Sequence, residues 1–247
     1  MKSSPASWGR ILPRRFYARP TVEVARGLLG AYLVHGPCVG RIVETEAYVG
    51  VHDLAAHASR GLTPRTRVLF GPPGHAYVYL IYGMHCCLNL VAEPEGRPGC
   101  VLIRALEPVA GIEQMRRRRP KARGLEALGA GPGRLTMAMG ITRRHNGQDV
   151  TRGSLVVRRP VSPEPVSIAV TTRVGVTHCA DWPLRFYIAG NRSISRASNR
   201  QNRQRVARHQ AIAAYAAMHR GSPADLDSEL EATSLDLWLA EAARDRK

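Results

Sequence analysis

Cysteine, lysine and long apolar runs are all scarce in this 247-residue sequence. Its five cysteines are an odd number with no CxxC pair, which argues against a disulfide framework or a zinc ribbon and favours a reducing compartment. Lysine stands only at positions 2, 121 and 247, so a lyase that forms a Schiff base has few candidates. No stretch reaches the roughly 18 apolar residues of a membrane helix, and the amino terminus lacks the apolar run of a signal peptide. We therefore expect a soluble, cytoplasmic protein with no membrane partner.

Metal-binding and nucleophile motifs are missing as well. The nine histidines never take a metal-ligand spacing such as HExxH, and no GxSxG elbow occurs. The glycine-rich GAGPG at 129–133 lacks the Lys-Ser/Thr of a P-loop, although backbone amides at the start of the following helix could hold one phosphate. The sequence therefore predicts no metal site.

Positive charge is in large excess: 36 Lys and Arg against 19 Asp and Glu give a formal net charge of +17 and a pI near 10.7. Such an excess suggests a polyanionic partner, although many arginine-rich proteins are merely soluble. The end of the chain is divided, because 196–220 carries six arginines and no acid whereas 221–247 carries seven acids and three bases. We interpret 196–247 as an appendage, helical or partly disordered, that follows a domain at 1–195.

Hydrophobic periodicity predicts more strands than helices. Helices are expected at 20–30, 109–119 and 134–139. Strands are expected at 31–34, 39–48, 75–80, 85–92, 99–106, 154–157, 166–170 and 185–188. Because helices do not alternate regularly with strands, a doubly wound sheet is not expected. The predicted fold class is α+β: a single domain with a curved mixed or antiparallel β-sheet core and peripheral helices.

The strand at 41–48, RIVETEAY, carries the strongest candidate for chemistry. Side chains alternate along a strand, so Glu44, Glu46 and Tyr48 share one face. A carboxylate beside an aromatic ring at a strand end can activate water next to a stacked planar ligand. The alternative is a solvated strand face with a tyrosine at its rim, and spacing alone favours that alternative.

Three tyrosines are concentrated within six residues. Tyr77 and Tyr79 alternate onto one strand face, and Tyr82 precedes Gly83, where the chain can turn sharply. A tyrosine at a hairpin tip could act as a wedge between base pairs, but the sequence by itself slightly favours ordinary sheet packing for all three.

Two polar residues interrupt apolar strands. Arg104 ends the run CVLIR, where a lone arginine is usually a surface or ion-pair residue. Asn89 lies in an apolar strand, where an amide is costly unless it is hydrogen-bonded. It could be a structural bridge or a reader of a polar ligand edge, and the sequence does not separate the two.

Several segments of the sequence are similar to those of a known family, the alkyladenine (3-methyladenine) DNA glycosylases. The resemblance covers about 12–195 and suggests a bacterial member. It is carried in order by RIVETEAY (41–48), AAH (55–57), TPR (63–65), YVYLIYGMH (77–85) with Asn89, VLIRALEP (101–108), GPGRL (131–135), RVGV (173–176) and PLRFY (183–187). Cys86 departs from it, because an aromatic residue is frequent there, and so does Arg192, near a usual proline. The 196–247 segment has no counterpart in the family pattern.

The resemblance implies catalytic and DNA-contacting roles. Glu46 resembles the general base that deprotonates the attacking water, and Arg104 resembles the group that helps to hold the water and a phosphate near it. Tyr82 resembles the residue that intercalates into the duplex.

The resemblance also implies a substrate pocket. Asn89 would face the purine edge and disfavour the amino group of unmodified guanine. Val174 and Gly175 would supply backbone contacts in the pocket wall and near DNA. Three side chains resemble the walls that sandwich a flipped base: Tyr48, His57 and Tyr79.

The implied activity is base-excision repair: an alkylated or deaminated purine is flipped out of double-stranded DNA and its N-glycosidic bond is hydrolysed, leaving an abasic site. The resemblance implies no cofactor, and we expect a monomer associated with the bacterial nucleoid. The main alternative is a catalytically inactive protein that binds damaged DNA with the same pocket. A second is a glycoside hydrolase that uses Glu44 and Glu46, although carboxylates adjacent on one strand face do not bracket a sugar bond well.

Overall fold

The computed structural model describes residues 8–81, 85–162 and 165–195. Two predictions lie outside these residues, namely the intercalating Tyr82 and the appendage at 196–247. One compact unit holds the described residues up to Tyr79 and from Cys86 onward, and Leu80–His85 is not part of it. All of the other candidate site residues lie in that unit.

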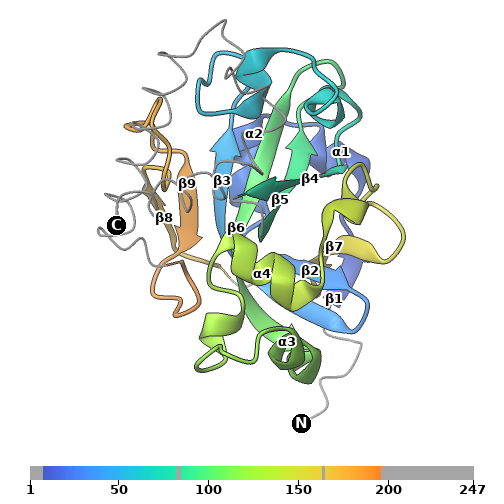
Figure 1. The fold of residues 1–247 in the computed structure, drawn as a ribbon, viewed down its shortest axis with the longest axis vertical. Helices are drawn as coiled ribbons and strands as arrows, with labels where there is room; N and C mark the ends of the chain where they lie inside the picture. The colour runs from blue at the N-terminus through green and yellow to red at the C-terminus, as the bar shows by residue number, and fades with distance from the viewer. Residues whose placement is uncertain (1–7, 82–84, 163–164, 196–247) are drawn as a thin grey trace, which may run out of the picture. The chain divides into compact units, whose positions relative to one another are not determined.

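A mostly antiparallel, nine-stranded sheet forms the centre of the fold, in the order β1-β7-β2-β3-β6-β5-β4, with β9 also paired to β3 and β8 paired to β9 (Figure 1). The strands are β1 (Trp8–Ile11), β2 (Tyr32–His35), β3 (Cys38–Tyr48), β4 (Ala76–Ile81), β5 (His85–Ala92), β6 (Gly99–Ala110), β7 (Leu155–Pro160), β8 (Ile168–Thr171) and β9 (Arg185–Ile188). The sheet is open, and the predicted α+β fold class is confirmed.

Along one of its edges, strand β3 pairs with two different strands. Its first part pairs with β2, from His35↔Cys38 to Tyr32↔Arg41. Its last part pairs with β9 instead, through Glu44↔Tyr187 and Glu46↔Arg185. On its other side β3 pairs with β6 over most of its length. Glu44 and Glu46 therefore lie between β6 and β9.

The pairing of β3 with β6 shifts register beside these carboxylates. Glu44 pairs with Ala105 whereas Thr45 pairs with Ile103, so Arg104 falls between two pairs. An extra residue on β6 changes the direction of the neighbouring side chains, as in a β-bulge. The Thr45 hydroxyl donates to the Ala25 carbonyl at 2.9 Å. Alternation then turns Glu44 and Glu46 away from that helical segment.

Four α-helices are present among the described residues: α1 (Arg14–Tyr17), α2 (Thr21–Gly27), α3 (Ile112–Arg118) and α4 (Pro132–Met139). Helix α2 packs on β3 and β6, and α4 packs on β6. Helix α4 ends at Met139, and the φ of 72° at the following Gly140 suits a residue without a side chain. Short 3-10 turns complete the fold: η2 (His57–Arg60), η3 (Arg67–Phe70), η4 (Glu126–Leu128) and η5 (Arg143–His145).

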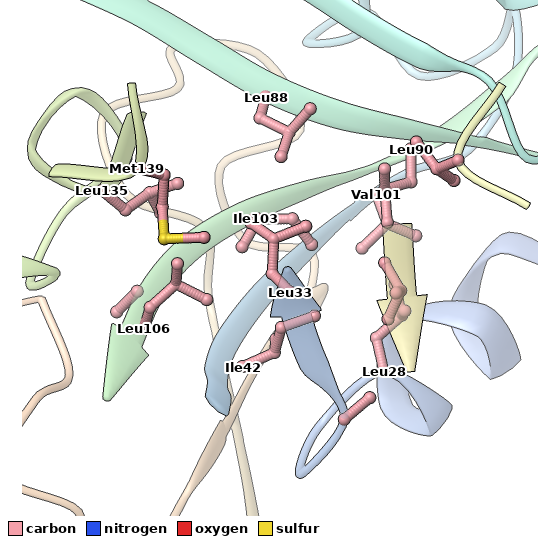
Figure 2. Packing of buried hydrophobic residues seen from close by; sticks show 14 of the residues in the cluster. Leu28, Leu33, Ile42, Leu88, Leu90, Val101, Ile103, Leu106, Leu135 and Met139 are labelled. Atoms are coloured by element: carbon pink, nitrogen blue, oxygen red, sulfur yellow. The ribbon is translucent and has the colours of Figure 1, made fainter. Parts of the chain in front are cut away.

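The hydrophobic core fixes β3 and β6 in place (Figure 2). Leu135 and Met139 of α4 lie beside Leu106 of β6, and Leu33 of β2 and Ile42 of β3 belong to the same buried cluster. Each fully buried leucine or isoleucine contributes roughly 1.5–3 kcal/mol relative to an exposed one. Strands held in this way form a rigid support for polar side chains at their ends.

Most predicted elements are present, with shifted ends. Strand β6 continues to Ala110, beyond the expected end at 106, so α3 begins at Ile112 rather than at 109. Strand β1 and helix α1 were not predicted, because four residues are too few to show a period.

The glycine-rich segment at 129–133 has a packing role. A Cβ on Gly129 would lie 2.2 Å from the Leu106 carbonyl oxygen, and Leu106 in turn donates its N–H to the Gly129 carbonyl. Only glycine permits this approach to β6. Close packing against β6 therefore accounts for this glycine without a bound phosphate.

Candidate active site

Glu46 lies at the centre of the candidate site and is fully buried. Its Oε1 lies 3.1 Å from Nη1 of Arg104 and accepts the Val174 backbone N–H at 2.7 Å. The Tyr48 hydroxyl donates to its Oε2 at 3.0 Å. Burial raises the pKa of Tyr48 well above its usual range, and the negative charge of Glu46 adds to this, so Tyr48 stays protonated. The donors around Glu46 suit an anion.

Arg104 bridges two carboxylates. Its Nε donates to Oε1 of Glu44 at 2.9 Å while Nη1 faces Glu46. Burial alone would lower the pKa of Arg104, but the charges of Glu46 and Glu44 outweigh it and raise the pKa above its usual value. The guanidinium is therefore permanently charged.

A second buried ion pair lies behind Tyr48. Arg173 binds Asp53 in a bidentate way, with Nη1–Oδ2 at 2.5 Å and Nη2–Oδ1 at 2.8 Å, and both side chains are inaccessible to solvent. The Arg173 guanidinium lies 4.7 Å from the centre of the Tyr48 ring. Asp53 also accepts the backbone N–H groups of Val49 and Ala55, both at 3.1 Å. This pair therefore fixes both Tyr48 and the loop that leads to His57.

Three aromatic rings gather beside this loop. The His57 ring lies 4.6 Å from the Tyr79 ring at 72°, and Tyr77 and Tyr79 are 5.4 Å apart. The Tyr77 hydroxyl is 2.9 Å from Nδ1 of His57. Burial first, and then the charges of Arg65 and Arg60, lower the pKa of His57 to about 4, so the imidazole is neutral at neutral pH.

Asn89 is buried within the sheet. Its Nδ2 donates to the Tyr77 carbonyl at 3.3 Å, and the Cys100 thiol lies 3.8 Å from its Oδ1. The amide nitrogen thus makes the structural bridge that the sequence left open. The Oδ1 atom receives only a weak thiol donor from the described residues.

The structure brings Glu46, Arg104, Tyr48 and Val174 into direct contact, with Gly175 next along the chain at a φ of 73°. His57 and Tyr79 form a neighbouring aromatic cluster, and Tyr48 and Tyr79 pack against the same group of buried residues. Tyr82 lies outside the described residues. Sequence reasoning missed four partners, the buried Asp53, Arg173 and Ser195 and the partly buried Arg185. Arg173 and Arg185 stand within RVGV and PLRFY, so those motifs were the available signal.

Two features are absent from the described part of the chain. No group of three or more His, Cys, Asp or Glu side chains within 8–81, 85–162 and 165–195 is placed to hold a metal ion. No helix in that part of the chain is long and apolar enough to cross a membrane.

Glu46 is thus a buried carboxylate held by an arginine and a tyrosine, between two paired strands of a mostly antiparallel sheet. Comparison with known proteins defines the family. The methylpurine-DNA glycosylase family model matches residues 15–192, and the chain belongs to this family. It is therefore a member of a family of DNA repair hydrolases that act on N-glycosyl bonds.

Similar proteins come from archaea and bacteria. The chain is 53% identical over 191 residues to a protein of Methanoculleus marisnigri, which covers 75% of this chain and 98% of that protein. It is 52% identical over 194 residues to a protein of Methanocella arvoryzae, with 75% and 96% covered. It is 47% identical over 194 residues to a protein of Legionella pneumophila strain Corby, with 76% and 99% covered. All three relatives are provisionally named 3-methyladenine DNA glycosylases.

Proposed function

We propose that this protein is a monofunctional DNA-3-methyladenine glycosylase, which flips an alkylated or deaminated purine out of duplex DNA and hydrolyses its N-glycosidic bond. The observation that carries the proposal is the buried Glu46, held by Arg104, Tyr48 and the Val174 N–H. The family match and the names of the relatives agree with it. The net charge of +17 suits a DNA partner.

Glu46 acts as the general base. Within the described residues its Oε2 receives one hydrogen bond, from Tyr48, and keeps a lone pair for a water. The carboxylate takes the proton of that water as its oxygen bonds to C1′ of the sugar. The bond from C1′ to the purine nitrogen breaks and its electron pair leaves with the base. Arg104 holds the carboxylate and the water in place.

Aromatic rings bind the everted base. Tyr48, His57 and Tyr79 form the walls, and a purine made electron-poor by alkylation gains a cation–π component from such rings. The low pKa of His57 keeps its ring uncharged, so it does not repel a cationic base. Asn89 faces the purine edge, and the backbone at Val174 and Gly175 completes the wall.

The direct experiment offers the full-length protein duplex oligonucleotides that carry single 3-methyladenine, 7-methylguanine, hypoxanthine or ethenoadenine residues. We expect free base to appear together with an abasic site, while the strand stays uncut until alkali is added, because no lysine lies among the site residues. Tight lesion binding with no base released from any duplex would favour the catalytically inactive binder. Strand cleavage without alkali would contradict a monofunctional mechanism.

The glycoside hydrolase alternative is not supported by the contacts of Glu44. Both of its oxygens are bonded, to Arg104 and Arg185 on one side and to Ser195 on the other, and the side chain is fully buried. A carboxylate engaged in this way is not free to serve as the second acid of a glycosidase.

Tyr82 is proposed as the wedge that fills the gap left by the flipped base. We expect Tyr82→Ala to weaken binding to a lesion duplex more than to the same lesion in a single strand, because only a duplex has a gap to fill. Fluorescence anisotropy on the two substrates measures the difference, and Tyr82→Phe, which keeps the ring, is the matched control. An equal loss on both substrates would remove this role.

A further inference from the structure

Glu44 has no role in the proposed chemistry, although it is as completely buried as Glu46. Its Oε1 lies 2.9 Å from Nε of Arg104 and 2.7 Å from Nε of Arg185. Ser195 donates its backbone N–H to Oε2 at 2.6 Å and its hydroxyl to Oε1 at 2.8 Å. Burial of a carboxylate is costly unless charges and donors replace water. These partners explain how the carboxylate is stabilised but not why one lies here.

The contacts of Arg104 indicate why a carboxylate lies at position 44. Its Nε is bound by Glu44, its Nη2 donates to the Ser195 hydroxyl at 3.1 Å, and its Nη1 lies 3.1 Å from Glu46. A guanidinium is planar, so two fixed nitrogens determine where the third one points. Arg104 also stands at a register shift of β6, where regular strand pairing does not fix its direction. Glu44 and Ser195 therefore orient the Arg104 guanidinium, which the strand pairing leaves unfixed.

These groups form a row of alternating charge. Arg185, Glu44, Arg104 and Glu46 follow one another, with each neighbouring pair at 2.7–3.1 Å. Glu44 thereby shares the positive charge of Arg104 with Glu46. Without Glu44, the row would hold two cations, Arg185 and Arg104, and one carboxylate, Glu46.

We propose that Glu44 and Ser195 are positioning residues, which aim Nη1 of Arg104 at Glu46 and limit the positive charge that Glu46 experiences. Ser195 lies beyond residue 192, where the family match ends. The candidate site therefore extends past the segment by which the family is recognised. This inference rests on the proposed function of Glu46.

Replacement of a single hydroxyl tests the positioning role. Ser195→Ala removes the contacts that the hydroxyl makes with Glu44 and Arg104, while the backbone N–H still donates to Glu44. We expect the single-turnover rate of base release to fall about 10- to 100-fold, the scale for a misplaced catalytic group, with Kd for lesion DNA unchanged. Ser195→Thr, which keeps a hydroxyl, should recover most of the rate.

Ser193→Ala is the matched control. Ser193 is buried in the same segment, and its backbone N–H bonds to Asn191 at 2.8 Å. We expect this variant to keep the wild-type rate. Equal rates for the Ser195→Ala and Ser193→Ala proteins would overturn the inference. A wild-type protein that releases no base would instead refute the proposed function, so the two failures are distinguishable.

Charge sharing is tested at Glu44 itself. Glu44→Gln keeps the size of the side chain but removes the negative charge that Arg104 and Arg185 share. We expect the single-turnover rate of base release to fall about 10- to 100-fold with Kd for lesion DNA unchanged, because the full charge of Arg104 then falls on Glu46. A wild-type rate for the Glu44→Gln protein would overturn charge sharing. If Glu44→Gln does not fold, the Ser195 comparison still decides the positioning role.

Discussion

The Glu46→Gln protein is expected to release damaged purines about 10²- to 10⁴-fold more slowly than the wild type, the range over which a general base contributes to a rate. Glutamine keeps the shape of the side chain but does not accept a proton from water. Arg104 keeps Glu44 as a partner in this variant, so the buried charge is not left isolated. The rate should be measured in single turnover, with excess enzyme over a lesion duplex.

Lesion binding separates chemistry from recognition in this experiment. We expect Kd of Glu46→Gln for the lesion duplex to stay close to that of the wild type, because the tyrosines and His57 are intact. Glu107→Gln is a suitable control, since Glu107 lies on β6 but its side chain is 42% exposed and it pairs with Arg41. A Glu46→Gln rate within twofold of the wild type would mean that another group activates the water.

The largest loss of stability is expected for Arg173→Met. This change leaves Asp53 charged, buried and without its partner, and breaking a buried pair in this way costs about 3–5 kcal/mol in the free energy of unfolding. Asp53 also holds the Val49 and Ala55 N–H groups, so the loop before His57 should loosen as well. Urea unfolding measures the loss.

Two further variants make the Arg173 experiment specific. Arg152→Met breaks an ion pair with Asp149 whose arginine is 82% exposed, and it should cost only about 0–1 kcal/mol. The double variant Asp53→Asn/Arg173→Met removes both charges and should be more stable than Arg173→Met alone. An Arg173→Met protein as stable as the Arg152→Met control would contradict the role given to this pair.

Much of the fold was predictable because strand signals are local. Alternation placed Glu44, Glu46 and Tyr48 on one face of the strand at 41–48, and the structure puts both carboxylates against Arg104. The ends of β6 and α3 were harder to predict. Pro108 suggests that the strand stops before it, whereas β6 continues to Ala110 and Gly111 separates the two elements.

The site residues divide in the same way. Glu46, Tyr48 and Arg104 were singled out by their positions in strands, Val174 came from a family motif, and the structure brings all four together. Asp53 gave no comparable signal, because a single aspartate in a polar loop is ordinary in any sequence. Its importance appears only once Arg173, 120 residues later, is seen to bind it.

The amino-acid sequence by itself determined the strands, the α+β class, the basic character and the family. These properties depend on composition, on a period of two residues and on motifs within short segments. Only the tertiary structure decided which nitrogen of Arg104 meets Glu46, and that Ser195 returns over 151 residues to bind Glu44. A register shift and a long-range return of the chain leave no local pattern, because both are set by how distant segments pack.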